Sequence, residues 1–403
     1  MADLLEVGVM FAAIAVAGVL STRLDKSVIP FYIVVGMMLS PSVAGQFSLG
    51  GYPLPSVEST EFVEIGAELG IVFLLFFLGL EFNPSRLVES RDRIVRAGTI
   101  DFVVNFAAGL LLGFVLFGDP LAALLVAGIV YISSSAIITK SLIDLGWIAN
   151  EEADPLLGTL VFEDLVIAVY LTVAAALVAG GDNITETATS VGIAVGFILV
   201  LVLVVYLGTA WFERSLATTS REFTVLRAIG ITVLVAGAAL ALGVSEAVAA
   251  FFVGMAFAST SHVQELEELL EPIRDTFAAV FFFWIGVETD PVLVAGVAGL
   301  VAVAAVVSVP TKAISGYLGG RVYGLSPRRS TRVGLGMVTR GEFSLIIAAV
   351  ALTGAGTSLT AATAESVYAF AVGYVLVMSI LGTLLMQYAA PIETAVEARL
   401  GTE

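Results

Sequence analysis

Phe73–Pro84 reads FLLFFLGLEFNP, and 207 residues further on Val280–Pro291 reads VFFFWIGVETDP. Each stretch is an aromatic-rich apolar run followed by Gly-x-Glu, two further residues and a proline. A looser pair, VVGMML at 34–39 and FVGMAF at 252–257, occurs in the same order. The two pairs predict that six helices recur as a second set of six, with a seventh helix between them. Because seven helices separate the copies, they cross the membrane in opposite directions, as the inverted repeats of secondary transporters do.

The composition is that of a membrane protein. Of 403 residues, 59% are hydrophobic and 13% are charged, and the mean hydropathy is +1.03. Soluble domains carry about 25% charged residues, so we expect an all-α polytopic membrane protein and exclude a soluble enzyme. The net charge of −17 argues against nucleic acid as a partner. The chain has no cysteine, which excludes disulfides and thiolate metal sites.

Apolar runs of about 16–27 residues predict about thirteen transmembrane helices. They lie near 6–23, 27–42, 62–83, 91–117, 121–145, 154–179, 188–210, 220–241, 243–259, 270–290, 292–317, 328–353 and 363–389. Only LGVSE separates 220–241 from 243–259, so one long tilted helix is the alternative there.

The basic residues predict the orientation. Fifteen of the 18 basic residues lie in the connections that follow odd-numbered predicted helices, at the ends of the adjoining helices or near the C-terminus. The N-terminus and the other connections contain none. Lys and Arg collect on the cytoplasmic side, so we expect the N-terminus outside, the C-terminus in the cytoplasm and the chain in the cell membrane. The three remaining bases, Lys140, Lys312 and Arg340, fall within predicted helices.

Glu163 and Asp164 are adjacent acids inside the sixth predicted helix, in VFEDLVIAVY. A charge at the bilayer centre costs at least about 2.5–3.5 kcal/mol, which makes each one a functional candidate. Adjacent helical residues point about 100° apart, so one acid can bind an ion while the other pairs with a base or faces water. The alternative is a static buried ion pair, but burying ions rarely stabilises a protein.

Ser133, Ser134 and Ser135 interrupt the fifth predicted helix, and Arg340 and Glu342 interrupt the twelfth in GMVTRGEFSLIIA. The repeat offset of 207 residues places the three serines opposite Arg340–Glu342. Polar interruptions at matching positions point to two broken helices whose ends meet at the substrate. The alternatives are helix packing by small residues for the serines and mutual pairing for Arg340 and Glu342.

Lys312 lies late in the eleventh predicted helix, and its counterpart in the repeat is Asn105. It either extends to the cytoplasmic face or pairs with Glu163 or Asp164. No phosphate-binding loop, HExxH motif or Gly-x-Ser-x-Gly motif occurs in the sequence. We therefore expect a non-enzyme without a cofactor, which uses an ion gradient.

These residues resemble those of monovalent cation:proton antiporters, nearest to the Kef-like and Nap-like branch of the sodium/proton exchanger superfamily. The resemblance rests on GLEFNP, SSSA, the Glu-Asp pair, the lysine of helix 11 and RGEFSLIIA, and it covers essentially the whole chain. It implies thirteen helices in two subdomains, with broken helices 5 and 12 crossing in a mobile core. The implied organisation is helices 1–3 (1–90) and 8–10 (220–290) as a dimerisation scaffold, helices 4–6 (91–180) and 11–13 (292–389) as the core, 188–210 as a linker helix and 390–403 as a short cytoplasmic tail.

The resemblance also assigns roles. Asp164 corresponds to the essential aspartate that binds the cation and the proton, and we expect it to be the acidic ligand of the monovalent metal ion. Glu163 and Lys312 correspond to an acid and its paired lysine. Ser134 and Ser135 match the polar pair at the first break, and Arg340 and Glu342 match the motif at the second. Kef proteins usually have Gln in place of Glu163 and an attached nucleotide-binding domain, whereas this sequence ends about fourteen residues after the last predicted helix. We expect that such a domain either was removed or is supplied by a separate cytoplasmic subunit.

The sequence thus predicts a homodimeric antiporter that exchanges Na⁺ or K⁺ for H⁺ by alternating access, surrounded by membrane lipid. Asp164 is the shared site, completed by Ser134, Ser135 and backbone carbonyls. Because Glu163 is ionisable, we favour electrogenic exchange. One alternative is a K⁺ efflux channel or its membrane subunit, which passes cations without proton movement. The other is a sodium-coupled symporter of an organic solute, which shares inverted repeats and broken helices.

Overall fold

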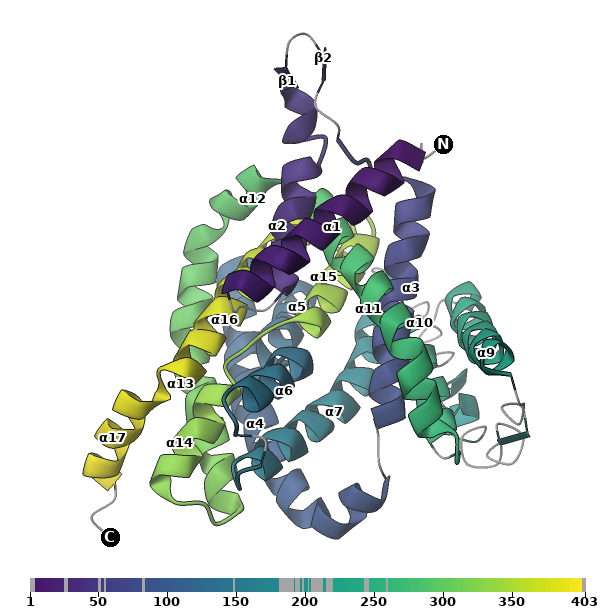
Figure 1. The fold of residues 1–403 in the computed structure, drawn as a ribbon. Helices are drawn as coiled ribbons and strands as arrows, with labels where there is room; N and C mark the ends of the chain where they lie inside the picture. The colour runs from purple at the N-terminus through teal and green to yellow at the C-terminus, as the bar shows by residue number, and fades with distance from the viewer. Residues whose placement is uncertain are drawn as a thin grey trace. The chain divides into compact units, whose positions relative to one another are not determined.

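A computed structural model describes residues 4–24, 28–49, 52–53, 56–81, 84–147, 149–180, 220–242, 246–258 and 260–400, with scattered residues between 192 and 214. Within these ranges the chain is nearly all helical, as predicted (Figure 1), and it divides into two compact units. Unit 1 comprises Met1–Ser21, Phe31–Asn83 and Ala168–Asp290, and unit 2 comprises Thr22–Pro30, Pro84–Ile167 and Pro291–Glu403. The assignment of these units as a scaffold and a moving core stays a prediction.

Unit 1 is built on α3, which packs against α10 and α11. The elements that lie wholly or mostly in it are α1 (Leu4–Leu24), α2 (Ile29–Leu39), η1 (Ala44–Gln46), β1 (Ser48–Leu49), β2 (Tyr52–Pro53), α3 (Glu61–Glu81), α9 (Arg221–Ala241), α10 (Glu246–Ala258) and α11 (Val263–Val287). α9 ends at Ala241 and packs against α10, so these are two helices and not one long tilted helix. The antiparallel pair β1–β2 was not predicted.

The glycines of the repeated motifs are the points where helices of unit 1 touch. A Cβ on Gly36 would overlap the carbonyl oxygen of Phe283, beside Gly286, and a Cβ on Gly79 would overlap that of Phe251, beside Gly254. In the repeat, Gly36 corresponds to Gly254 and Gly79 corresponds to Gly286. Exchanging the two copies therefore converts one contact into the other. This pseudo-two-fold relation explains physically why these glycines recur.

Replacing Gly254 with valine is expected to destabilise the protein by more than the about 1–3 kcal/mol typical of overpacking, because backbone cannot move aside as a flexible side chain can. The matched control is Gly237→Val on α9, where a Cβ would meet nothing within 4 Å. Thermal stability of the two purified variants in detergent measures the difference. Equal stability would show that the close approach of α10 to α3 does not exist.

Unit 2 contains two interrupted helices. Its elements are α4 (Pro84–Phe117), α5 (Pro120–Tyr131), α6 (Ser135–Asp144), the first part of α7 (Ala153–Gly180), α12 (Pro291–Gly296), α13 (Ala298–Val322), α14 (Pro327–Gly336), α15 (Glu342–Thr353), α16 (Ala361–Gln387) and α17 (Ala389–Leu400). Subtracting 207 from the bounds of α16 gives 154–180, against 153–180 for α7. The breaks at 132–134 and 337–341 correspond in the same way, which confirms the predicted broken helices.

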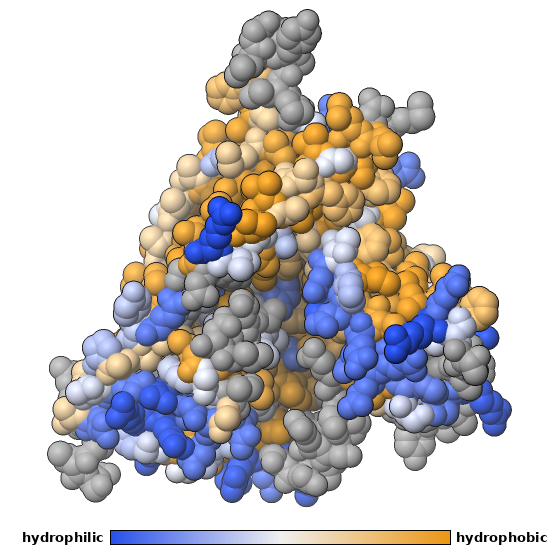
Figure 2. All heavy atoms as spheres, viewed as in Figure 1, coloured by the Kyte–Doolittle hydropathy of each residue, from blue (hydrophilic) through white to orange (hydrophobic). Residues whose placement is uncertain are grey.

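Eight of the described helices are long and apolar enough to cross a membrane, and three shorter apolar helices accompany them. Apolar side chains such as Leu4, Phe11 and Val16 are exposed on α1, and Figure 2 shows hydrophobic surface over this helix. Such an apolar exterior suits a lipid environment. The predicted helix at 188–210 lies mostly outside the described residues, so the count of thirteen stays a prediction. The predicted tail at 390–403 contains a helix, α17.

Candidate functional site

The two broken helices meet through their backbones in unit 2. Asp119 caps α5 by accepting from the N–H of Ala122, and α5 ends where Ile132 turns to an extended conformation. The N–H of Ser134, in the first break, donates to the carbonyl oxygen of Thr339, in the second break, at 3.3 Å. Gly341 opens α15 directly against Ser134, where a Cβ would overlap the serine hydroxyl. The place where the two breaks meet, called the crossing below, therefore needs glycine at position 341.

Arg340 is fully buried and holds the carbonyl ends of two half-helices. Its Nε and Nη2 donate to the carbonyl oxygen of Val130 near the end of α5, at 3.0 and 2.7 Å. Its Nη1 donates to the carbonyl oxygens of Met337, Val338 and Thr339, which follow α14, at 2.9–3.1 Å. Carbonyl groups at a helix C-terminus carry partial negative charge and lack partners in the helix. The guanidinium supplies both hydrogen bonds and positive charge at this point.

Glu342 lies at a helix N-terminus, in the first turn of α15, whereas Arg340 lies at helix C-termini. Its Oε2 accepts from the hydroxyl of Ser134 at 2.8 Å, and the same hydroxyl accepts from the N–H of Ile137 in the first turn of α6. An acid is favourable where helix N–H groups point outward. The crossing thus places a base at two C-terminal ends and an acid at two N-terminal ends.

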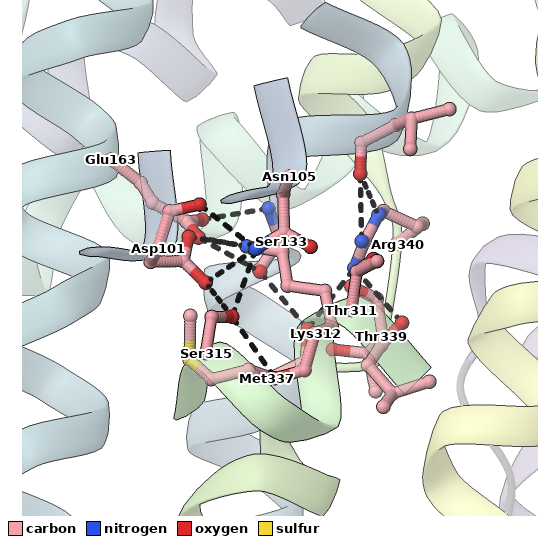
Figure 3. Close-up of polar contacts among 12 residues, drawn as sticks. Asp101, Asn105, Ser133, Glu163, Thr311, Lys312, Ser315, Met337, Thr339 and Arg340 are labelled. Carbon is pink, nitrogen blue, oxygen red and sulfur yellow. Dashed lines mark hydrogen bonds and ion pairs between the residues drawn. The ribbon is translucent and has the colours of Figure 1, made fainter. Parts of the chain in front are cut away.

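Lys312 joins α13 to α4 and α7. Its Nζ lies 2.5 Å from Oε1 of Glu163 and 2.7 Å from Oδ2 of Asp101 (Figure 3). The three side chains are 0–1% exposed. Ser315 and Asn105 donate to Oδ1 of Asp101 at 2.7 and 2.9 Å. One buried ammonium therefore serves two buried carboxylates, and hydroxyl and amide donors complete the shell of Asp101.

Glu163 is also bound to the first break. The backbone N–H of Ser133 donates to its Oε2 at 2.7 Å, and the Ser133 hydroxyl contacts its Oε1 and the carbonyl oxygen of Met337, both at 3.1 Å. Asp164, the next residue on α7, is 7% exposed, against 0% for Glu163. The helix points the two carboxylates about 100° apart, so they face different surroundings, and both are buried.

The structure brings most of the predicted residues into one unit. Lys312 pairs with Glu163, one of its two expected partners, and does not extend to the surface. Ser133 contacts Glu163, Ser134 contacts Glu342, and Ser135 begins α6. The cation-binding role of these residues stays a prediction.

Sequence reasoning did not predict that Lys312 also pairs with a second carboxylate, that of Asp101. The available signal was the repeat register, because Asn105 corresponds to Lys312 and lies four residues from Asp101 on the same helix.

The chain matches known proteins along nearly its whole length. The family model described as sodium/hydrogen exchanger, transmembrane, matches residues 9–387. The K(+)/H(+) antiporter subunit KhtU of Bacillus subtilis is 36% identical over 94% of this chain and 92% of its own length. The ammonium/H(+) antiporter subunit AmhT of Alkalihalophilus pseudofirmus is 30% identical over 97% of this chain and 94% of its own.

A solved structure shares the fold. That of the sodium proton antiporter MjNhaP1 from Methanocaldococcus jannaschii matches with a TM-score of 0.72 at 15% identity, covering 98% of this chain and 99% of that one.

Proposed function

The chain belongs to the transmembrane sodium/hydrogen exchanger family and exchanges a monovalent cation for protons, and we propose that Asp164 is the group on which cation and proton compete. The observation that carries this proposal is the contrast between the two adjacent acids. Glu163 is bound by Lys312 and Ser133, whereas Asp164 points about 100° away from it on the helix and is slightly less buried, at 7% exposure against 0%. A carboxylate that is largely buried is stabilised either by a proton or by a cation, so each ion displaces the other.

The broken helices supply the rest of the proposed site. Backbone groups of the two breaks, with the hydroxyls of Ser134 and Ser135, are oxygen donors of the type that alkali cations accept. Arg340 neutralises the carbonyl ends of α5 and α14, because its donors are bound to their backbone oxygens. Exchange by alternating access then requires that unit 2 carry this site between the two sides of the membrane.

We propose K⁺ as the preferred cation, with Na⁺ as the alternative. KhtU carries K(+)/H(+) antiporter in its name, and GerN of Bacillus cereus, 27% identical over 86% of this chain, is named a Na(+)/H(+)-K(+) antiporter. The names of KhtU and AmhT also contain the word subunit, which supports a separate regulatory partner. Location in the plasma membrane, the N-terminus outside, a homodimer and electrogenic exchange complete the proposal.

In proteoliposomes that contain a pH-sensitive dye, K⁺ is expected to give the largest cation-dependent pH change among K⁺, Na⁺, Li⁺ and NH₄⁺. Because proton and cation compete for one carboxylate, the apparent Km for the cation should rise as the pH falls. Once the site is mostly protonated, the rise should be up to about tenfold for each unit by which the pH is lowered. Protein-free liposomes are the control. Cation flux without pH change would favour a channel, and a requirement for an organic solute would favour a symporter.

A further inference from the structure

A second cluster of charged residues lies at the end of unit 2 where α14 begins. Glu393 on α17 accepts from Nε of Arg328 at 2.8 Å and from Nε of Arg332 at 2.7 Å. The two arginines are one turn apart on α14, and the Glu393 side chain is only 2% exposed. Figure 2 shows the hydrophilic surface over α14 and α17. A short C-terminal helix is thus fixed to a half-helix by a buried carboxylate that accepts from two guanidinium groups.

Arg332 extends this cluster to the helix that carries Glu163 and Asp164. Its Nη1 donates to Oε1 of Glu152 at 2.6 Å, and Glu152 is the residue directly before α7. The Arg332 guanidinium also lies over the ring of Trp147, 4.8 Å from its centroid. One arginine therefore connects α14, the start of α7 and, through Glu393, α17.

The far end of α14 is part of the candidate site. The carbonyl oxygen of Met337, directly after α14, accepts from the hydroxyl of Ser133 and from Arg340. The helix has only ten residues, so it spans about 15 Å at 1.5 Å per residue. Contacts therefore connect Arg332 along this short helix to the second break and, through Glu152, to the helix that holds Asp164.

We infer that Glu393 is a positioning residue for cation exchange. It holds Arg328 and Arg332, and through them α14 and α7 hold the second break and Asp164 at fixed positions relative to each other. The inference rests on the proposed site at Asp164. It gives α17 a part in transport.

The chemistry of the cluster supports a fixed arrangement. Isolated exposed ion pairs contribute little to stability and would position nothing, but here Glu393 and Glu152 are buried and the pairs share Arg332. Burial alone would raise the pKa of the Glu393 carboxyl, but hydrogen bonds from Arg332 and Arg328 outweigh it and hold that pKa below its usual range. The carboxylate is therefore charged at neutral pH, and the pairing is lost only as the pH falls through this lowered value.

The test compares Glu393→Gln with Glu397→Gln, which changes an exposed acid on the same helix. Glu393→Gln is expected to raise the apparent Km for K⁺ by about 2- to 30-fold, the range of mutations that act on a site through a coupled element, with maximal turnover within about twofold. Glu393→Asp, which keeps the charge, should recover part of the affinity. Glu397→Gln should match the wild type. The assay is K⁺-dependent pH change in proteoliposomes, normalised to folded protein.

Hydrogen exchange of residues 330–339 provides a second measurement. In Glu393→Gln these amides should exchange faster, whereas in Glu397→Gln they should not. Arg328→Gln is the second variant, in case Glu393→Gln fails to fold. It removes one of the two guanidinium groups that donate to Glu393, from an arginine that is half-exposed. It should raise both the apparent Km for K⁺ and the exchange rate of these amides.

An unchanged Km in the folded variants, or a lower turnover at unchanged Km, would overturn the inference. Normal exchange by Asp164→Asn would instead overturn the proposed site, so the two failures are distinguishable.

Discussion

Asparagine at position 164 is expected to abolish cation-dependent proton movement. The amide has almost the size of the carboxylate, so the packing of α7 is kept, but it cannot take up and release a proton or offer a negative charge to a cation. We expect residual exchange below about 1% of the wild-type rate, because no step remains in which the two ions compete for one group. Dequenching of a pH-sensitive dye after K⁺ addition to proteoliposomes measures it.

Asp154→Asn is the matched control. Asp154 lies in the first turn of the same helix, α7, and is exposed, so the identical chemical change is made outside the site. This variant should exchange cations at the wild-type rate. Normal exchange by Asp164→Asn would show that Asp164 is not the shared site, and Glu163 would become the candidate. Loss of exchange in both variants would point to a general requirement for acids on α7.

The parts of the fold that follow from local pattern could be predicted from the sequence. Long apolar runs identify α1, α3, α4 and α16 because a membrane span has to be apolar over its whole length. The two breaks were predictable because Ser133–Ser135 and Arg340–Glu342 place polar groups in such runs. The hairpin β1–β2 and helix α17 carry no such signal: both are short and lie outside apolar runs, where length and hydropathy decide nothing.

Most members of the candidate site were predictable, and so was the pairing of Lys312 with Glu163, but the other contacts of these residues were not. Each buried charge is conspicuous in an apolar helix, which identified Glu163, Asp164, Lys312 and Arg340. Their partners depend on how helices far apart in the sequence pack together. Lys312 meets Asp101 across 211 residues. The donors of Arg340 go to backbone carbonyls, which every residue has and which no sequence pattern marks.

Replacing Lys312 with methionine is expected to destabilise the protein strongly. The side chain has similar length and fits an apolar setting, but its removal leaves Asp101 and Glu163 at 0–1% exposure without their shared ammonium. Removing one partner of a buried ion pair costs about 3–5 kcal/mol, and here two acids lose the same partner. Thermal unfolding in detergent should show a clear drop. Unchanged stability would mean that the pairing of Lys312 contributes nothing to the folded protein.

The triple variant Lys312→Met, Asp101→Asn and Glu163→Gln separates stability from coupling. It removes all three buried charges together, so no buried charge is left without a partner, which is the main cost of the single change. We therefore expect most of the lost stability to return. Asp164 is intact in this variant, so exchange that remains should proceed with one proton per cation and should not respond to an imposed membrane potential. A potential-dependent rate in the triple variant would show that Glu163 carries no coupled charge, and electrogenic exchange would then need another proton carrier.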